Sequence, residues 1–354
     1  MNQKFDYIIV GLGLAGSTLA WELKKRGKQV MVFDSPSKNK ASALAAGLFN
    51  PVTGKYLVKT WEADIIFPFF ERFYTSAEQQ LHQKFFHLLP VFSPFSSLEE
   101  RDLWKRKSES DELKPYAKAF HEQPVFAHQV NNPLGGMEIA HSGYLDVPLW
   151  IESVRNFLIS EKSFTEGELD EAEISFQDEV SYRGFHADKI IFCNGLSALS
   201  SQWFKNLPII PLKGEVLTAR INTILERVYN RSVYIVPAAS ANTYTIGSTY
   251  ERPPFNEGIT SVARNLLESK LSELTPCPYE IIHQNWGMRP TTIDRRPMLG
   301  AHPDNKNVIL FNGLGTKGVS LAPYFAHHLA DWLEGRGELL REVNIFRFKA
   351  LYSG

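Results

Sequence analysis

A glycine-rich turn between a short apolar segment and a helix is the feature that most constrains this chain. Residues 5–10 (FDYIIV) form an apolar run that ends at Gly11. Residues 17–26 (STLAWELKKR) then show the helical spacing of apolar side chains, and Gly27 has the position of a helix C-terminal cap. Residues 29–33 (QVMVF) are β-branched and apolar, as expected of a buried strand. The sequence therefore predicts a strand, a helix and a second strand at the start of the chain.

The turn itself reads Gly11-Leu-Gly13-Leu-Ala-Gly16, and Asp34 ends the second strand. In this pattern the first glycine permits a tight turn, the second lets the backbone approach a pyrophosphate, and the third lets helix and strand pack closely. The phosphates then lie at the positive helix end, and Asp34 accepts hydrogen bonds from the adenosine ribose. An acid here disfavours a ribose phosphate, which argues against NADP. The predicted contacts of a bound dinucleotide are Gly11, Leu12, Gly13, Leu14, Ala15, Gly16, Asp34 and Ser35.

Length and composition indicate a folded chain with more than one core. The chain has 354 residues, of which 44% are hydrophobic and 22% are charged, so we expect two domains. The formal net charge of -1 gives no global electrostatic reason to expect a nucleic acid or an anionic membrane as a partner. Cys193 and Cys277 are the two cysteines, which is typical of a reducing compartment. Cys193 is interpreted as a small buried hydrophobic residue.

The sequence shows neither a membrane span nor a secretion signal. Asp6 lies within the short apolar stretch at the amino terminus, and no run approaches the roughly 20 apolar residues that cross a bilayer. We therefore expect a cytoplasmic protein with no membrane partner. The sequence does not indicate an oligomeric state.

The remaining chain changes from aromatic-rich to strand-like segments. From about 60 to 130 the pattern favours helices, with Pro68 interrupting them. Four strand-like runs follow, at residues 188–193, 209–219, 232–237 and 242–247. The last two are separated by a short Ala/Ser segment, which predicts a hairpin in a second, largely antiparallel sheet. A buried strand is predicted at residues 307–311, and a helix at residues 319–334 despite Pro323.

Four further segments occur in a characteristic order. They are residues 41–51 (ASALAAGLFNP), 188–195 (DKIIFCNG), 208–214 (PIIPLKG) and 286–297 (WGMRPTTIDRRP). Together they resemble the D-amino-acid oxidase and glycine oxidase superfamily over nearly the whole chain, most weakly between about 75 and 140. The resemblance implies FAD as the cofactor. It also implies that the cofactor is contacted by Ser42, Ala46, Gly47, Leu48, Asn50, Cys193, Asn194 and Gly195.

The segment around Arg289, Gly-Met-Arg-Pro, is the most diagnostic of these. It is similar to the Gly-Leu-Arg-Pro segment of the superfamily, whose arginine pairs with the substrate carboxylate; a planar, permanently charged fork suits this task. The resemblance therefore implies that Arg289 binds the carboxylate and also borders the FAD. Tyr234 falls where the glycine oxidase branch places a tyrosine hydroxyl against the same carboxylate. A core tyrosine on a strand is the alternative interpretation.

Residues 312–318 (NGLGTKG) follow a predicted strand and open the last helix, so their amides and the positive helix end are expected to face the flavin pyrimidine. The turn is similar to that of the flavin domain in the bifunctional tRNA wobble-uridine modification enzyme, which oxidises an N-linked glycine. Lys317 is interpreted either as a charge at the flavin or substrate, or as a solvated lysine. The predicted flavin contacts here are Gly313, Leu314, Gly315, Thr316, Lys317 and Gly318.

These patterns predict an α/β flavoprotein with a Rossmann-like FAD-binding domain and an interleaved, mostly antiparallel α+β substrate domain. The predicted FAD-binding domain comprises residues 1–75, 140–210 and 286–354, and the substrate domain comprises residues 76–139 and 211–285. The resemblance implies dehydrogenation of the CH–NH bond of a small carboxylated amine, such as a glycine-like, D- or N-substituted amino acid, by hydride transfer to flavin N5. Oxygen or another electron acceptor is the expected second partner. We expect residues between about 60 and 135 to set the side-chain specificity.

Three alternative functions are also compatible with the sequence. The first is oxidation of a carboxymethylamino group on tRNA, although a near-neutral chain makes nucleic acid an unexpected partner. The second is a flavin-binding protein that uses its redox state for signalling rather than turnover. The third is an NAD-dependent dehydrogenase, since the glycine motif recognises the adenosine diphosphate of either cofactor. No metal site is predicted, because His327 and His328 are adjacent on a helix and point in different directions.

Overall fold

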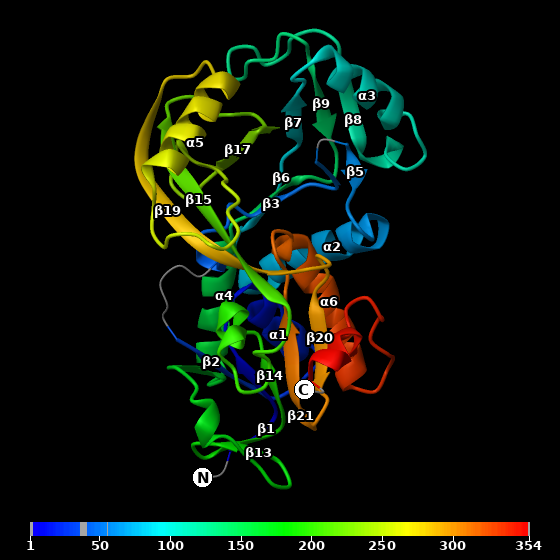
Figure 1. Ribbon diagram of the computed structural model, residues 1–354, viewed down its shortest axis with the longest axis vertical. Coiled ribbons are helices and arrows are strands. Elements are labelled where there is room, and N and C mark those ends of the chain that lie inside the picture. The colour runs from blue at the N-terminus through cyan, green and yellow to red at the C-terminus, as the bar shows by residue number, and fades with distance from the viewer. Residues whose placement is uncertain (1–2, 36–40, 55, 353–354) are drawn as a thin grey trace.

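The computed structural model describes residues 3–35, 41–54 and 56–352 and shows an elongated molecule with two bodies stacked along its long axis (Figure 1). Each body is built around an eight-stranded sheet. Both chain ends lie at the body drawn at the bottom of Figure 1. The chain passes between the two bodies several times, so the two sheets are interleaved in sequence, as predicted.

The first sheet has a parallel centre. Its strands are β1 (Gln3–Val10), β2 (Val30–Asp34), β11 (Phe164–Glu166), β12 (Ser175–Phe176), β13 (Val180–Tyr182), β14 (Phe185–Phe192), β20 (Met298–His302) and β21 (Asn305–Asn312). Their order is β11-β2-β1-β14-β13-β12, and β21 joins β14 to β20. The neighbours from β11 to β14, and β14 with β21, pair in parallel, while β12, β13 and β20 pair antiparallel. This parallel centre confirms the Rossmann-like prediction.

The second sheet is mostly antiparallel. Its strands are β7 (Val91–Pro94), β8 (Ala117–His121), β9 (Gly136–Ile139), β15 (Ile209–Ile221), β16 (Val228–Arg231), β17 (Val233–Pro237), β18 (Thr243–Gly247) and β19 (Tyr279–Thr292). They follow the order β19-β15-β18-β17-β16-β7-β9-β8, and β16 pairs with β7 in parallel. The predicted hairpin is present as β17 and β18. The long strands β15 and β19 pair along their length and run from this sheet towards the other body (Figure 1).

Helices and two small sheets fill the space around these two large sheets. The helices are α1 (Leu14–Lys25), α2 (Ala63–Leu81), α3 (Leu98–Ser108), α4 (Val147–Ser160), α5 (Ser261–Leu274) and α6 (Gly318–Leu333). The small sheets pair β3 (Leu48–Phe49), β10 (Gly143–Leu145) and β6 (Phe86–Leu88), and β4 (Val52–Thr53) with β5 (Val58–Lys59). Short 3-10 helices occur at Ala41–Ala43, Lys114–Tyr116, Glu171–Glu173, Gly195–Leu199 and Ile345–Tyr352.

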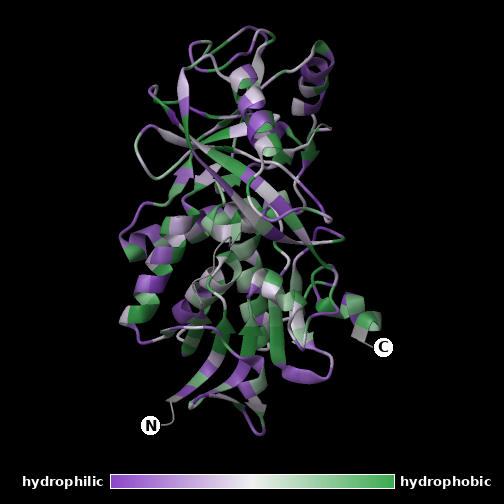
Figure 2. Ribbon diagram, turned by 60° about the vertical axis from the view of Figure 1, so that its left-hand side comes forward, coloured by the Kyte–Doolittle hydropathy of each residue, from purple (hydrophilic) through white to green (hydrophobic). Residues whose placement is uncertain are grey.

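Four helices, α1, α2, α4 and α6, pack together on one face of the first sheet and bury its apolar side chains. Two hydrogen bonds fix this packing: Trp150 Nε1 donates to Ser17 Oγ at 2.9 Å, and the Tyr74 hydroxyl donates to the Val319 carbonyl at 3.1 Å. The opposite face packs on residues such as Phe204. The carboxyl-terminal halves of β1, β14 and β21 are accordingly hydrophobic (Figure 2), which is the pattern of a parallel sheet covered on both faces.

The segment from about 60 to 130 differs from the helical prediction. It holds α2 and α3, but also the strands β6, β7 and β8, so the helical prediction was wrong for those three stretches. Pro68 lies inside α2 and does not interrupt it. A proline in a helix removes one backbone donor, and here the helix keeps its buried aromatic face in compensation. Pro323 lies inside α6 in the same way, as predicted.

No helix within residues 3–35, 41–54 and 56–352 is long and apolar enough to cross a membrane. We propose that the two eight-stranded sheets mark the cofactor and substrate domains, with the boundaries given above from the sequence.

Candidate active site

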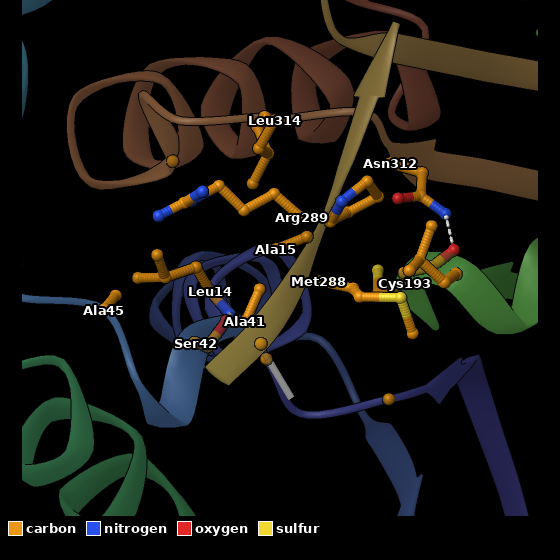
Figure 3. Close-up of a pocket in the computed structure, with 18 of the residues that line it drawn as sticks. Leu14, Ala15, Ala41, Ser42, Ala45, Cys193, Met288, Arg289, Asn312 and Leu314 are labelled. Atoms are coloured by element: carbon orange, nitrogen blue, oxygen red, sulfur yellow. Dashed lines mark hydrogen bonds between the residues drawn. The ribbon is translucent and has the colours of Figure 1, made fainter. Parts of the chain in front are cut away.

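A cavity of about 1700 Å³ lies where the two bodies meet. Figure 3 shows side chains from separate parts of the chain converging on it. Leu14 and Ala15 come from the start of α1, Ala41 and Ser42 from the segment after β2, Cys193 from the end of β14, Arg289 from β19, and Leu314 from the turn before α6. The carboxyl ends of the parallel strands therefore open into this cavity, where α/β sheets usually bind ligands.

The glycine turn forms one wall of the cavity and leaves no room for side chains. Gly11 has a φ of +98°, and a Cβ built on it would lie 2.7 Å from the Cys193 carbonyl oxygen. A Cβ on Gly16 would lie 1.8 Å from the Gly11 carbonyl oxygen, so this glycine lets α1 pack directly on the turn. A Cβ on Gly13 would lie 3.2 Å from Ser42 Oγ at the cavity wall. These contacts are the ones expected from the spacing of the motif.

Hydrogen bonds hold this wall together. The Leu12 amide donates to Asp34 Oδ1 at 2.9 Å, and the Leu14 amide donates to Ser42 Oγ at 3.1 Å. Asp34 is 6% exposed, and its Oδ2 lies 3.5 Å from an Arg155 guanidinium nitrogen. Since Asp34 ends β2 and borders the cavity, one carboxylate both braces the glycine turn and faces the space where a ligand would lie.

The segment after β2 and the end of β14 form the adjoining walls. A Cβ on Gly47 would lie 1.8 Å from the Leu145 carbonyl oxygen, which fixes this turn against β10. Burial raises the pKa of the Cys193 thiol well above its usual range, which agrees with its interpretation as a buried hydrophobic residue. Asn194 Oδ1 is buried and lacks a hydrogen-bond partner among the described residues. The Gly195 carbonyl accepts from Asn312 Nδ2 at 2.8 Å (Figure 3).

The turn that opens α6 lies beside the start of α1, since a Cβ on Gly318 would lie 3.0 Å from Leu14 Cδ1. The Gly315 amide donates to the Pro290 carbonyl at 3.0 Å, which attaches the turn to β19. Lys317 Nζ donates to Thr60 Oγ1 at 2.6 Å and to Thr53 Oγ1 at 3.2 Å. Burial, together with the nearby charge of Arg295, lowers the pKa of Lys317 to about 8. Lys317 is therefore held at the cavity wall and is not a solvated lysine.

Arg289 extends from β19 into the cavity, and none of the described acidic residues forms an ion pair with it. Its Nη2 donates to Ser248 Oγ at 3.1 Å, and its guanidinium lies 5.2 Å from the centre of the Tyr250 ring. Its Nη1 is buried and has no hydrogen-bond partner in the part of the chain that the structure describes. A Cβ on Gly214 would lie 2.2 Å from this Nη1, so the guanidinium occupies space that only a glycine leaves open. A buried guanidinium with an unused donor is suited to an incoming carboxylate.

Tyr234 lies two strands away from Gly214 on the same sheet, and its side chain also borders the cavity. A Cβ on Gly247, its partner on β18, would lie 2.6 Å from the Tyr234 hydroxyl. Burial raises the pKa of Tyr234 to about 12, and the Arg289 charge opposes this shift only in part. The phenol therefore stays protonated at neutral pH and can donate a hydrogen bond.

Most of the residues selected from the sequence border this one cavity. They are Gly11, Gly13, Leu14, Ala15, Asp34, Ser35, Ser42, Ala46, Gly47, Leu48, Asn50, Cys193, Asn194, Gly195, Tyr234, Arg289, Leu314, Gly315, Thr316, Lys317 and Gly318. Leu12, Gly16 and Gly313 lie behind the wall instead. Leu12 and Gly16 support the turn, and a Cβ on Gly313 would lie 2.6 Å from Thr292 Cγ2.

The structure also adds cavity residues that the sequence analysis missed. Residues 167–172 border the cavity because β11 pairs in parallel with β2, so the Gly167 amide donates to the Asp34 carbonyl at 3.0 Å. The sequence signal that could have indicated this segment is Gly167, which directly follows the short strand β11. Other additions are Ser197, Ser200, Ser201, Gln202, Asn230, Ser248, Tyr250 and Glu257. No residue between 60 and 135 borders the cavity, so this segment makes no direct contact there, and its role in specificity stays a prediction.

The two adjacent histidines do not form a metal site. His327 Nδ1 lies 2.8 Å from Glu22 Oε1, and His328 Nε2 accepts from the Leu340 amide at 3.0 Å. Within residues 3–35, 41–54 and 56–352, no cluster of three or more His, Cys, Asp or Glu residues has the arrangement of a metal site.

Comparison with known proteins identifies the family. A family model described as FAD dependent oxidoreductase, DAO, matches residues 6–332. The chain belongs to this family. It is 25% identical to a glycine oxidase from Bacillus licheniformis over 98% of each chain. It is 23% identical to a glycine oxidase from Bacillus subtilis (strain 168), over 97% of this chain and 95% of the relative.

Solved structures of the family share the fold. The structure of glycine oxidase from Geobacillus kaustophilus matches with a TM-score of 0.75 and 20% identity, over 96% of both chains. That of iminodiacetate oxidase from Chelativorans sp. BNC1 matches with a TM-score of 0.77 and 20% identity, over 95% of this chain and 98% of the other. The resemblance inferred from the sequence is thus confirmed, and the chain is an FAD-dependent oxidoreductase.

Proposed function

We propose that this enzyme dehydrogenates the CH–NH bond of a small carboxylated amine, such as glycine or a D- or N-substituted amino acid. The observation that carries the proposal is the Arg289 guanidinium, which borders the cavity and whose buried Nη1 is unpaired among the described residues. The names of the relatives, glycine oxidase and iminodiacetate oxidase, support a substrate with a carboxylate next to an amine.

We propose that the cavity holds FAD along the wall from Asp34 to Lys317. Gly13, at the cavity wall, leaves space for a pyrophosphate at the amino end of α1, where the helix dipole favours negative charge. Asn194 Oδ1 is a buried acceptor that has no partner in the described chain and is available to a donor of the cofactor. The amino end of α6, with Lys317, lies beside the amino end of α1 and adds positive potential to this wall.

The chain's own residues would bind and orient the substrate. Arg289 would make two parallel hydrogen bonds to the carboxylate, and the Tyr234 hydroxyl would donate a third. Ser248 and Tyr250 hold the guanidinium from its other sides. This grip would orient the carbon next to the amine towards the bound cofactor. The substrate enters as the free amine, so no protein base is required.

Bound FAD supplies the hydride acceptor for this reaction, and oxygen or another acceptor receives the electrons afterwards. The substrate carbon loses a hydride and the nitrogen a proton, which leaves an imine. Water then hydrolyses the imine to an oxo acid and an amine or ammonia. Lys317, held by two threonine hydroxyls, places a cation beside the site where negative charge develops.

An anaerobic flavin-bleaching screen on purified holoprotein tests this proposal. The flavin absorbance is followed with glycine, sarcosine, D-amino acids, L-proline and N-substituted glycines. We expect one carboxylated amine to bleach the flavin, and Arg289→Ala to slow bleaching about 100-fold or more. Arg220→Ala is the matched control, since Arg220 is an exposed partner of Glu280 on the same sheet. If the protein retains FAD and none of these amines bleaches it, the proposal fails in favour of a tRNA substrate or a redox-sensing role.

A further inference from the structure

A buried pair of charged residues lies behind the Arg289 site, on β15, the strand that pairs with β19. Lys213 and Glu215, on β15, are 0% and 1% exposed, and Lys213 Nζ lies 3.2 Å from Glu215 Oε1. Gly214, which lies between them in the sequence, leaves space for the Arg289 guanidinium. The sequence analysis gave this pair no role, and neither residue borders the cavity. Burying two charges is costly, so such a pair needs an explanation.

The Glu215 carboxylate is surrounded by hydrogen-bond donors. It accepts from the Thr260 amide and the Thr260 hydroxyl, each at 2.9 Å, and from Gln284 Nε2 at 2.7 Å. Gln284 Nε2 also donates to the Thr260 carbonyl at 2.8 Å. Every neighbour is a donor, so a carboxylate matches this position and a neutral amide, which carries two donors of its own, does not.

Thr260 ends a loop that begins at residue 248, and β15 also holds the beginning of this loop. The Glu215 amide donates to Thr249 Oγ1 at 2.8 Å, and the Thr249 amide donates to the Glu215 carbonyl at 3.1 Å. Lys213 and Glu251 exchange two backbone hydrogen bonds, and Lys213 Nζ lies 3.5 Å from the Glu251 carboxylate. The loop from residue 248 to residue 260 is therefore attached to β15 at both ends, while residues 252–254 between them are exposed.

This loop delivers side chains to Arg289. Ser248 accepts from the Arg289 guanidinium, the Tyr250 ring packs beside it, and Glu257 borders the cavity. Tyr250 is 64% exposed, so its place depends on the loop backbone rather than on burial of its ring. Lys213 Nζ also lies 5.9 Å from the centre of the Trp286 ring, another cavity residue. The buried pair thus contacts two elements of the cavity wall from behind.

We propose that Glu215, paired with Lys213, is a positioning residue for carboxylate recognition: its carboxylate fixes the Thr260 end of the loop 248–260, its backbone fixes the Thr249 end, and the loop thereby holds Ser248 and Tyr250 against Arg289. This inference rests on the proposed function, because it gives Arg289 the task of binding a carboxylate. It predicts that loosening the loop weakens binding of the carboxylate without changing the cofactor site.

The test uses the Glu215→Gln holoprotein, with Glu280→Gln as the matched control on the exposed part of β19. Two properties are measured: amide hydrogen exchange of residues 249–260, and the dissociation constant of acetate from its perturbation of the flavin absorbance. We expect faster exchange in this loop and an acetate dissociation constant raised about 10-fold, with FAD content unchanged. For an amine that bleaches the wild-type flavin, KM should rise while kcat stays within about 2-fold, which a general loss of stability would not produce.

Gln284→Met is the second variant if Glu215→Gln does not fold, because Gln284 is only partly buried and bridges the carboxylate to Thr260. We expect the same two changes, with the acetate constant raised about 3-fold. Faster exchange with unchanged acetate binding and unchanged KM overturns the inference. A different result would contradict the proposed function itself: wild-type protein that does not bind acetate, with Arg289→Ala indistinguishable from wild type. This failure is recognised without any Glu215 variant, so it is separate from failure of the present inference.

Discussion

The two ends of the cavity are built in different ways. At the α1 end, the wall is backbone from one continuous turn, in which Gly11 and Gly16 bring atoms into direct contact. At the Arg289 end, the wall is side chains that come from separate strands, with Arg289 on β19 and Tyr234 on β17. The first end depends on the absence of side chains, and the second on their exact length and direction.

This difference determines how each end responds to change. A backbone wall has no rotamers to adjust, so an added methyl group must move a helix or a strand. A side-chain wall can adjust, so an added methyl group displaces one functional group and leaves the fold intact. Substitutions at the two ends are therefore expected to affect different properties: folding and FAD content at one end, and substrate binding at the other.

The largest effect is expected for Gly16→Ala. The new Cβ would lie 1.8 Å from the Gly11 carbonyl oxygen, so α1 must separate from the turn. We expect the free energy of unfolding to fall by about 3 kcal/mol and the FAD content to drop. Urea unfolding and the flavin-to-protein absorbance ratio measure both. Gly337→Ala is the control, since nothing lies within 4 Å of a Cβ there. Full FAD content in Gly16→Ala would show that this wall is not rigid.

A large but different effect is expected for Gly214→Ala. Its Cβ would lie 2.2 Å from Arg289 Nη1, which is the end of a long side chain and can move. We expect KM for the amine found in the bleaching screen to rise about 100-fold, with FAD content and unfolding free energy close to wild type. Steady-state kinetics and denaturation measure these. Loss of FAD in this variant would contradict the separation of the two ends.

A smaller effect is expected for Tyr234→Phe, which removes one hydrogen bond to the substrate carboxylate. We expect KM to rise about 10-fold. Because burial raises the pKa of Tyr234 to about 12, the phenol stays protonated between pH 6 and pH 10 and the ratio of the two KM values should not change with pH. Steady-state kinetics of the variant and the wild type between pH 6 and pH 10 measure the ratio of their KM values. An effect that disappears at alkaline pH would indicate that the phenol ionises in the working range.

The smallest effect is expected for Lys317→Met and depends on pH. Burial lowers the pKa of Lys317 from 10.5 to about 8, so between these values the unfolded chain binds more protons than the folded one. The wild-type protein should therefore gain stability, relative to the variant, as pH rises through this window, and the difference between the two proteins should stay constant with pH outside it. We expect a change of about 1 kcal/mol for each pH unit inside the window. Unfolding at several pH values tests the sign, and a relative loss of stability would refute it.

The fold was predictable where local pattern and tertiary role agree. The β1-α1-β2 unit follows from the glycine spacing, and the β17-β18 hairpin from two strand-like runs joined by a short turn. The strands β7 and β8 were not predicted, because their aromatic residues are as frequent in buried helices and their partners are distant in sequence. Pro68 was taken as a helix breaker, but a buried aromatic face outweighs the loss of one backbone hydrogen bond.

The candidate site was predictable where its residues lie close together in the sequence. The glycine turn, residues 41–51 and the Arg289 segment all lead to the cavity. The loop that carries Ser248 and Tyr250 was missed, because its approach to Arg289 results from attachment to β15, which no local pattern reports. The segment after β11 was missed for the same reason, since its place follows from pairing with β2.

The ladder of β15 and β19 also has a mechanical consequence. These strands, of 13 and 14 residues, are paired along their length and extend from one body to the other, so they act as a stiff beam rather than as a flexible linker. Rotation of one body about the other would have to bend this beam or break its backbone hydrogen bonds. We therefore expect substrate to enter and product to leave by displacements of loops and side chains, without a large hinge closure between the two bodies.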